Sequence, residues 1–280
     1  MTAQRRKDAS HYLKHWNLIQ DGDEILTHSS LLLPVRKNAE PLMLKIVDLN
    51  DDEALAWQIL KIYNGRGAVF LVDASGPAQL LERITPDERV ADLESMVLSG
   101  KEEQALDILC QSVINLQTIV RESSSFKPVN SFHSRILEMQ KHMQSRVFLK
   151  ETQSMLQSAL SVSLELEKDH CQIPLHGDLH HFNLLNSKTR GWLAIDPKGI
   201  YGSREYDFAI PLCNPYPHTD LVACPKRMKR LARRIETNYG FCAELILKYT
   251  WIHALQVGAW STDPDCHQYW LACAKAAVRA

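Results

Sequence analysis

The chain has 280 residues, 45% of them hydrophobic, and its 32 basic and 33 acidic side chains leave a formal net charge of −1 at pH 7. A chain of this length buries a sizeable core and approaches the size at which one core divides into two, so we expect two cooperating lobes. The near-zero charge supplies no global field to attract nucleic acid or an anionic membrane, and no apolar run is long enough to span a bilayer.

Cysteine usage and the N-terminus indicate the compartment. Seven cysteines are scattered without C-x-x-C spacing, a pattern typical of reduced thiols and of neither a disulfide framework nor a zinc site. The N-terminus opens Met-Thr-Ala-Gln-Arg-Arg and carries no apolar signal segment. We therefore expect a cytoplasmic protein. No pattern in the sequence indicates an oligomeric state.

Short β-like runs dominate residues 1–84, the first predicted lobe, and one helix is expected from about Asp51 to Tyr63. Asp51 and Asp52 stand at the start of this helix, where carboxylates favour the exposed amides and the positive end of the helix dipole. The predicted strands are Glu24–Leu33, Leu42–Val47, Ala68–Asp73 and Gln79–Ile84.

Two features of this lobe bear on function. Lys45 lies between the apolar residues Leu44 and Ile46, and a lysine there is costly unless its ammonium finds an anion. The alternative is an edge-strand lysine whose ammonium reaches water. Gly65 and Gly67 follow the helix and precede a strand, which predicts a tight turn with positive φ rather than a nucleotide-binding loop.

The pattern changes near residue 85, and residues 85–280, the second predicted lobe, are mainly helical. The stretch 131–164 is too long for one undisturbed helix, so we expect a break near Arg146 to Lys150. The predicted helices are Asp87–Leu98, Glu102–Arg121, Ser131–Leu164 and three more between Pro225 and the C-terminus.

One of these C-terminal helices is strongly basic. Its segment Lys226–Arg234 is interpreted as a solvated helix face, because Met228, Leu231 and Ile235 recur at helical spacing on the other face.

The strongest chemical signal is the stretch Leu175-His-Gly-Asp-Leu-His-His-Phe-Asn183, followed by Trp192-Leu-Ala-Ile-Asp196. Phosphoryl transfer to a hydroxyl requires one carboxylate to orient the attacking hydroxyl and accept its proton, and further oxygen ligands to hold Mg²⁺ against the phosphates. Asp178 is the candidate catalytic carboxylate, and Asn183 and Asp196 are the candidate metal ligands.

The predicted local structure supports this division of roles. The spacing between Asp178 and Asn183 leaves room for a short loop in which the carboxylate and the amide face a common point. The segment 184–195 reads as two strands joined by a polar turn, and the second strand delivers Asp196 at its end.

The same segment carries His176, His180 and His181 beside Asp178, a cluster of imidazole and carboxylate groups able to bind zinc or iron. A metal-dependent hydrolase is therefore an alternative function. The helical H-E-x-x-H pairing is absent and no second ligand cluster accompanies the first. This favours loop-shaping roles, with His176 buried and His180 or His181 near the substrate.

These motifs resemble the H-G-D-x-H-x-x-N catalytic loop and the following I-D strand of aminoglycoside phosphotransferases, which share the protein-kinase-like fold. Within that group the likeness is nearest to the streptomycin 6-phosphotransferases and the aminoglycoside/hydroxyurea antibiotic resistance kinases. The similarity extends from about residue 25 to residue 210. The matching segments are Leu175–His181 with Asn183, Arg190–Pro197 with Gly199, Asn64–Val69 and Ser29–Leu31.

The resemblance implies an α+β, two-lobed protein-kinase-like fold, with a small β-rich N-terminal lobe, a larger mainly helical C-terminal lobe and ATP bound between them. It makes Lys45 similar to the kinase strand lysine that contacts the α and β phosphates, with Glu53 on the next helix as its partner. Asp52 is the neighbour that could replace Glu53. The adenine is expected against backbone groups of the connecting segment around Glu82 and Ile84.

The phosphate-covering turn departs from the protein-kinase pattern, because G-x-G-x-x-G and the P-loop motif are both absent. By resemblance to the same subfamily, backbone amides and the hydroxyls of Ser29 and Ser30 are expected to donate to the β or γ phosphate, the alternative being a plain turn between strands. Asp207 is expected to support the catalytic loop, the alternative being an ordinary early-helix acid.

Together these features predict an ATP- and Mg²⁺-dependent small-molecule kinase that moves the γ-phosphate to a hydroxyl of an acceptor, such as the aminoglycoside streptomycin. A nucleotide-binding pseudokinase would keep the fold and lose transfer, although the intact set of Asp178, Asn183 and Asp196 speaks against it. The expected partner is a small-molecule hydroxyl acceptor, without nucleic acid or membrane.

Overall fold

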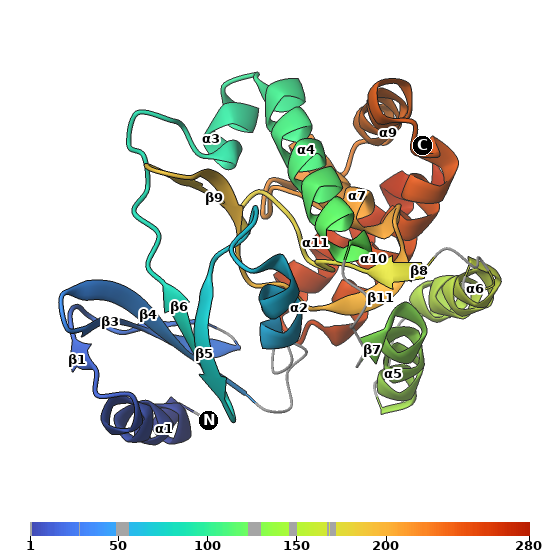
Figure 1. Cartoon of the computed structure of the whole chain (residues 1–280). Helices are drawn as coiled ribbons and strands as arrows, with labels where there is room; N and C mark the ends of the chain where they lie inside the picture. The colour runs from blue at the N-terminus through green and yellow to red at the C-terminus, as the bar shows by residue number, and fades with distance from the viewer. Residues whose placement is uncertain are drawn as a thin grey trace.

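The computed structural model describes residues 2–27, 29–48, 56–122, 130–145, 150–166, 168 and 172–280. It contains a six-stranded antiparallel sheet within residues 19–82 and a larger helical part that follows (Figure 1). This is the predicted α+β arrangement. The boundary at residue 84 stays a prediction, because helix α2 (Ala56–Tyr63) packs into the core of the helical part.

The sheet has the strand order β1-β3-β4-β6-β5, and β2 pairs with β3. The strands are β1 (Ile19–Gln20), β2 (Ile25–Leu26), β3 (Ser30–Lys37), β4 (Glu40–Val47), β5 (Leu71–Ser75) and β6 (Ala78–Glu82). The single strand predicted over 24–33 is wrong: it is two antiparallel strands, β2 and β3. Thr27 closes the turn between them, because its backbone N–H donates to the Ser30 carbonyl at 2.9 Å.

The side chains of strand β4 alternate between the two faces of the sheet. Leu42, Leu44 and Ile46 are almost fully buried on one face. Because side chains alternate along a strand, Lys45 points to the opposite face. It is only 1% exposed there. The central position of β4 therefore carries this ammonium into the protein interior, and the edge-strand alternative for Lys45 does not hold.

Helix α1 (Thr2–His15) was not predicted from the sequence. It packs on β3 and β4 at the lower left of Figure 1. Its apolar stripe is short, with Ala9 and Tyr12 buried in the helix and Trp16 just beyond it. The Trp16 indole donates to the Asp73 carboxylate at 3.0 Å. The helix is stabilised mainly by this tertiary packing, because its mean hydropathy is low and its first turn has no acidic residue.

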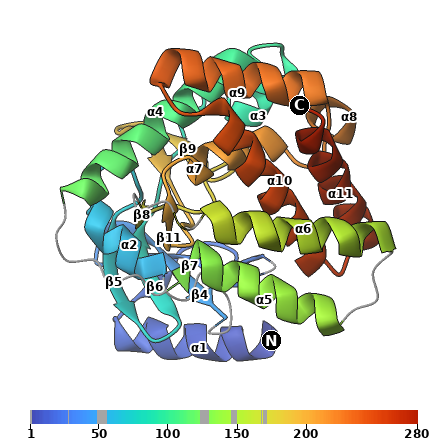
Figure 2. The ribbon, with the colours of Figure 1, turned by 90° about the vertical axis from the view of Figure 1, so that its right-hand side faces the viewer.

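The helical part contains the predicted C-terminal helices and confirms the predicted break, since α5 ends at Ser145 and α6 begins at Lys150. Figure 2 shows α5 and α6 side by side, with α10 and α11 behind them. The helices are α3 (Leu93–Leu98), α4 (Glu102–Arg121), α5 (Phe132–Ser145), α6 (Lys150–Leu166), α7 (Tyr206–Ala209), α8 (Thr219–Val222), α9 (Pro225–Tyr239), α10 (Ala243–Trp260) and α11 (Pro264–Val278).

The helix predicted from Asp87 begins later, at Leu93. The Asp92 carboxylate caps it by accepting the Ser95 backbone N–H at 2.8 Å, and residues 87–90 form a turn instead. None of the described helices combines the length and the apolar composition that crossing a membrane requires. The six described cysteines are free thiols, as expected.

Two short sheets lie within the helical part, and residues 175–183 connect a strand of one to a strand of the other. One is the hairpin of β9 (Leu184–Ser187) and β10 (Gly191–Ala194), as predicted. The other is formed by β7 (Asn130–Ser131), β11 (Ile200–Ser203) and β8 (Gln172–Pro174).

The β9–β10 hairpin is hydrogen-bonded to the segment that enters the larger sheet before β5 and to the segment that leaves it after β6. Val69 N–H donates to the Ala194 carbonyl at 2.9 Å, and Lys188 N–H donates to the Thr85 carbonyl at 2.9 Å. The hairpin therefore fixes the end of β10 relative to the β-rich lobe.

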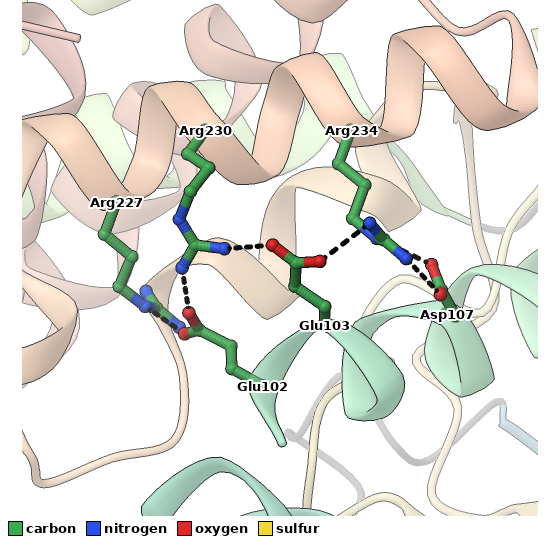
Figure 3. Close-up of polar contacts among 6 residues, drawn as sticks. All are labelled: Glu102, Glu103, Asp107, Arg227, Arg230 and Arg234. Carbon is green, nitrogen blue, oxygen red and sulfur yellow. Dashed lines mark hydrogen bonds and ion pairs between the residues drawn. The ribbon is translucent and has the colours of Figure 1, made fainter. Parts of the chain in front are cut away.

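The basic face of α9 is solvated only in part. Lys226, Lys229, Arg230 and Arg233 are exposed, as predicted, but acids of α4 cover Arg227 and much of Arg234 (Figure 3). The α4–α9 ion-pair cluster consists of Arg227, Arg230 and Arg234 on α9 with Glu102, Glu103 and Asp107 on α4. The opposite face of α9 is buried at Met228, Leu231 and Ile235, as predicted. A polar helix face has the same sequence pattern whether it meets water or a complementary helix.

Arg227 is the buried member of the cluster, with a 5% exposed side chain. It pairs with Glu102 and also donates to the carbonyls of Leu212 and Asn214, each at 2.8 Å. Arg230 pairs with Glu102 and Glu103 but is 48% exposed.

We expect Arg227→Ala to lower the free energy of unfolding by about 3 kcal/mol, because it removes the donor of two buried carbonyls and of one oxygen of the largely buried Glu102 carboxylate. Glu102 then keeps only the partly exposed Arg230 as its partner. Arg230→Ala, the matched control, should cost less than about 1 kcal/mol because water screens an exposed pair. Urea denaturation of both variants measures the difference, and equal losses would contradict the distinction.

Candidate active site

The candidate catalytic loop, residues 175–183, runs from β8 to β9 and is held by contacts with the protein interior. Leu175 and Leu179 are fully buried, and the Asp207 carboxylate accepts the backbone N–H groups of His176 at 3.1 Å and Gly177 at 2.8 Å. Burial raises the pKa of Asp207 to about 7, and the two amides oppose that rise. The predicted supporting role of Asp207 is thus matched by its contacts.

Gly177 allows the loop to turn toward Asp178. Its φ is +79°, and a Cβ there would lie 2.8 Å from Ile200 Cγ1. Backbone in this region favours glycine, and the adjacent strand β11 leaves no space for a side chain.

We expect Gly177→Ala to lower the free energy of unfolding by about 2 kcal/mol more than Gly240→Ala, because overpacking adds to the backbone strain common to both. Gly240 is the matched control, since its φ is +73° and nothing lies within 4 Å of an added Cβ. Thermal or urea unfolding tests this expectation, which fails if the two variants lose the same stability.

Asp178 and Asn183 meet across the loop. Asn183 Nδ2 donates to the Asp178 carbonyl at 2.8 Å and lies 3.4 Å from the carboxylate Oδ2. This orientation turns the amide oxygen Oδ1 away from the loop backbone, which makes it the atom suited to a cation. The Asp178 side chain is 26% exposed.

Asp196 follows β10 and receives Lys45 from the β-rich lobe. Lys45 Nζ lies 2.9 Å from Asp196 Oδ1, and the Asp196 side chain is 30% exposed whereas that of Lys45 is 1% exposed. Asp196 has a φ of +54°, an unusual conformation for a non-glycine residue that is typical of functional sites. Ile195 N–H donates to the Asn183 carbonyl at 3.0 Å, so both candidate metal ligands and Lys45 lie in one region.

The loop histidines do not form a metal site. His176 is 1% exposed, its Nε2 bonds the Ile195 carbonyl at 3.0 Å and its Nδ1 accepts the Asp178 N–H at 3.3 Å. Both nitrogens are thereby engaged in holding the loop. Among the described residues, no three His, Cys, Asp or Glu side chains are arranged to hold a metal ion. The alternative of a metal-dependent hydrolase is not supported.

Burial keeps several histidines neutral. It lowers the pKa of His176, His181 and His253 to about 3 each. His253, on α10, bonds the Tyr206 hydroxyl through Nδ1 at 2.9 Å. Because the ordinary value is 6.5, each of these rings takes up a proton on unfolding below pH 6.5, and stability is lost as the pH falls from 6.5 toward 3.

We expect His253→Asn to weaken this pH dependence, because asparagine retains an acceptor for the Tyr206 hydroxyl but does not titrate. Between pH 7 and pH 5, the wild-type chain should lose about 2 kcal/mol more of its unfolding free energy than the variant. Urea denaturation at the two pH values measures this difference. Parallel losses would show that His253 is not neutral in the folded chain.

The turn that contains Ser29 and Ser30 is less exposed than the sequence predicted. Ser30 is 2% exposed, and its hydroxyl lies 2.8 Å from the Thr27 hydroxyl. Its contacts hold the turn together, whereas Ser29 is partly exposed beside it. His28 and Glu53 lie outside the described residues.

The connecting segment is tied to the hairpin by its side chains. Glu82 forms an ion pair with Arg190, which also donates to the Gly65 carbonyl. Ile84 is partly buried against the large core. The structural role of Arg190 was not predicted, and the residue entered the sequence analysis only as the first position of the matching segment Arg190–Pro197.

Comparisons with known proteins show which families the sequence is similar to. The sequence model of the family described as aminoglycoside/hydroxyurea antibiotic resistance kinase matches residues 15–264. The chain is 34% identical over 243 residues to a streptomycin 3''-kinase of Klebsiella pneumoniae, covering 85% of this chain and 86% of that protein. It is 26% identical over 225 residues to a streptomycin 6-kinase of Streptomyces glaucescens, covering 79% and 70%.

Solved structures confirm the protein-kinase-like fold. The crystal structure of aminoglycoside phosphotransferase APH(4)-Ia superposes with a TM-score of 0.63 at 14% identity, covering 98% of both chains. Choline kinase from Cryptosporidium parvum gives a TM-score of 0.61 at 14% identity, covering 95% of this chain and 89% of that one. At these identities the likeness is one of fold alone.

Proposed function

Because the chain belongs to the aminoglycoside/hydroxyurea antibiotic resistance kinases, we propose that it transfers the γ-phosphate of ATP to a hydroxyl of an aminoglycoside, with streptomycin as the first acceptor to test. The observation that carries the proposal is the meeting of Asp178, Asn183 and Asp196 with Lys45 in one region. A pseudokinase is disfavoured by the same set of residues.

Asp178 is the proposed general base. Its carboxylate is partly exposed in a loop whose backbone is held by Asp207. There it accepts a hydrogen bond from the acceptor hydroxyl and receives its proton as the new O–P bond forms. Its neighbour Asn183 holds the loop through the Asp178 carbonyl rather than through a strong bond to the carboxylate. The base therefore keeps its lone pairs for the acceptor.

Asn183 Oδ1 and the Asp196 carboxylate are the proposed Mg²⁺ ligands. Both are hard oxygen donors, and two of them suffice because Mg²⁺ retains water and binds substrate phosphates. When bound, the ion neutralises charge on the phosphates. Neither His176 nor His181 competes for it, because both rings are buried.

Lys45 and the turn at Ser29 and Ser30 are the proposed phosphate contacts. The Lys45 ammonium already lies beside the proposed metal ligand Asp196, at 2.9 Å from its carboxylate. Ser29 is the main donor proposed there, because it is partly exposed, whereas both the hydroxyl and the backbone N–H of Ser30 bond the Thr27 hydroxyl. The adenine is proposed to lie along Glu82 to Ile84, and Glu53 remains the proposed helix partner of Lys45. The reaction is proposed to take place in the cytoplasm.

Acceptor-dependent ADP release tests the proposal. Purified chain with Mg²⁺ and ATP should release ADP in step with phosphorylation of streptomycin, and phosphorus NMR of the product identifies the modified hydroxyl. Hydroxyurea belongs in the same panel, since one relative is named a hydroxyurea phosphotransferase. ATP binding without transfer to any hydroxylated acceptor would favour the pseudokinase.

A further inference from the structure

His180 differs from the other two histidines of the catalytic loop in its exposure. Its side chain is 20% exposed, whereas His176 and His181 are 1% and 5% exposed. It lies between Asp178 and Asn183 in the sequence, and its carbonyl accepts the Asn183 N–H at 3.0 Å. The same short turn therefore holds both His180 and the proposed metal ligand Asn183.

The loop selects one tautomer of His180. Nδ1 lies 3.2 Å from the Phe182 backbone N, and a backbone amide can only donate. Nδ1 must therefore carry a lone pair, so the ring proton is on Nε2. The loop thus fixes both the ring and the position of its N–H.

This N–H lies beside the proposed catalytic base. His180 Nε2 is 3.9 Å from Asp178 Oδ1, which is too long for a direct hydrogen bond. An oxygen atom placed about 2.8 Å from each atom, an ordinary hydrogen-bond distance, fits between them with an angle of about 90° at that oxygen. The pair offers a donor and an acceptor to one hydroxyl.

We propose that His180 Nε2–H and the Asp178 carboxylate together hold the attacking hydroxyl of the acceptor. The hydroxyl donates its hydrogen to Asp178 and accepts a hydrogen bond from His180, which leaves its second lone pair for the γ-phosphorus. This inference rests on the proposed kinase function and makes His180 a further catalytic residue.

The protons and electron pairs of the step balance without any further reactant. The acceptor oxygen forms a bond to the γ-phosphorus, the bond from that phosphorus to the bridging oxygen breaks, and its electron pair leaves with ADP. The hydroxyl proton moves to Asp178, and His180 keeps its own proton throughout. The contribution of His180 is orientation of the nucleophile before attack.

The competing explanation is that His180 only closes the turn through Nδ1. Two substitutions separate the explanations, because the side-chain oxygen of asparagine lies near the position of Nδ1 and the amide nitrogen of glutamine lies near that of Nε2. His180→Asn retains an acceptor for the Phe182 N–H, and His180→Gln retains a donor toward Asp178.

We expect His180→Gln to keep kcat/KM for the acceptor within about 3-fold of wild type, and His180→Asn to lower it about 10- to 100-fold, as for the loss of one hydrogen bond near a charged group. KM for ATP should be unchanged in both variants. An Asn variant as active as the Gln variant, or more active, would overturn the proposal and leave a purely structural role. Unfolding curves for the two variants identify any loss that comes from misfolding.

Hydrolysis of ATP without an acceptor separates this inference from the proposed substrate. A water molecule also carries an O–H group and can take the place of the acceptor hydroxyl. The rate of slow ADP release in buffer should therefore fall in the same order, with wild type and His180→Gln above His180→Asn. Hydrolysis with that order, without streptomycin transfer, would overturn the proposed acceptor and retain the role of His180. Nitrogen NMR of the wild-type imidazole gives a second readout: Nε2–H is expected, and Nδ1–H would overturn the proposal.

Discussion

Replacing Asp178 by asparagine is expected to lower kcat for phosphoryl transfer by about 10²- to 10⁴-fold, the usual contribution of a general base. The variant keeps the shape of the side chain but cannot accept the hydroxyl proton. The backbone carbonyl that binds Asn183 remains in place, so the fold and KM for ATP should change little. Steady-state kinetics at saturating Mg²⁺ measure both quantities.

Asp8→Asn is the matched control, because Asp8 is a partly exposed carboxylate on α1 that accepts a hydrogen bond from Gln4, and α1 packs against β3 and β4. It should transfer phosphate at the wild-type rate. An Asp178→Asn enzyme with unchanged kcat would remove Asp178 from the chemical step, and a large rise in KM for ATP would indicate a binding role instead.

Replacing Asp196 by asparagine is expected to lower turnover at least about 100-fold at low Mg²⁺ concentration, with partial recovery as the concentration rises. Asp196 is the anionic member of the proposed ligand pair, since Asn183 is neutral, and the loss of that charge weakens binding of a hard cation. The variant also removes the carboxylate that lies 2.9 Å from Lys45 Nζ.

Titration calorimetry of nucleotide at several Mg²⁺ concentrations provides a readout other than activity. The dependence of ATP affinity on Mg²⁺ should be weaker in Asp196→Asn than in wild type and unchanged in Asp178→Asn. Identical Mg²⁺ dependence in all three proteins would contradict the assignment of Asp196 as a ligand. Recovery of Asp178→Asn at high Mg²⁺ would contradict the separation of base and ligands.

The features of the site that are local in sequence could be predicted. The loop of residues 175–183 and the hairpin β9–β10 follow from turn residues and short apolar runs, and the structure has both. The support from Asp207 and the burial of His176 were also predicted. The residues in these contacts are about thirty positions apart at most. They therefore fall within one short stretch of sequence that can be interpreted without knowledge of the fold.

The features that depend on distant residues were harder to predict. Lys45 and Asp196 are 151 positions apart, and their direct ion pair was not predicted, because only family resemblance connected the two segments. Glu102 and Arg227 are 125 positions apart, and the basic helix was consequently assigned to solvent. Helix α1 was missed because its apolar positions are few and become informative only once the sheet face they cover is known.

A structure of the chain with Mg²⁺ and a non-hydrolysable ATP analogue tests the central claim most directly. We expect Asn183 Oδ1 and the Asp196 carboxylate on the metal, the Lys45 ammonium within hydrogen-bond distance of a phosphate oxygen, and Asp178 without a metal contact. A nucleotide bound away from these four residues, or a metal held by histidine nitrogens, would contradict it.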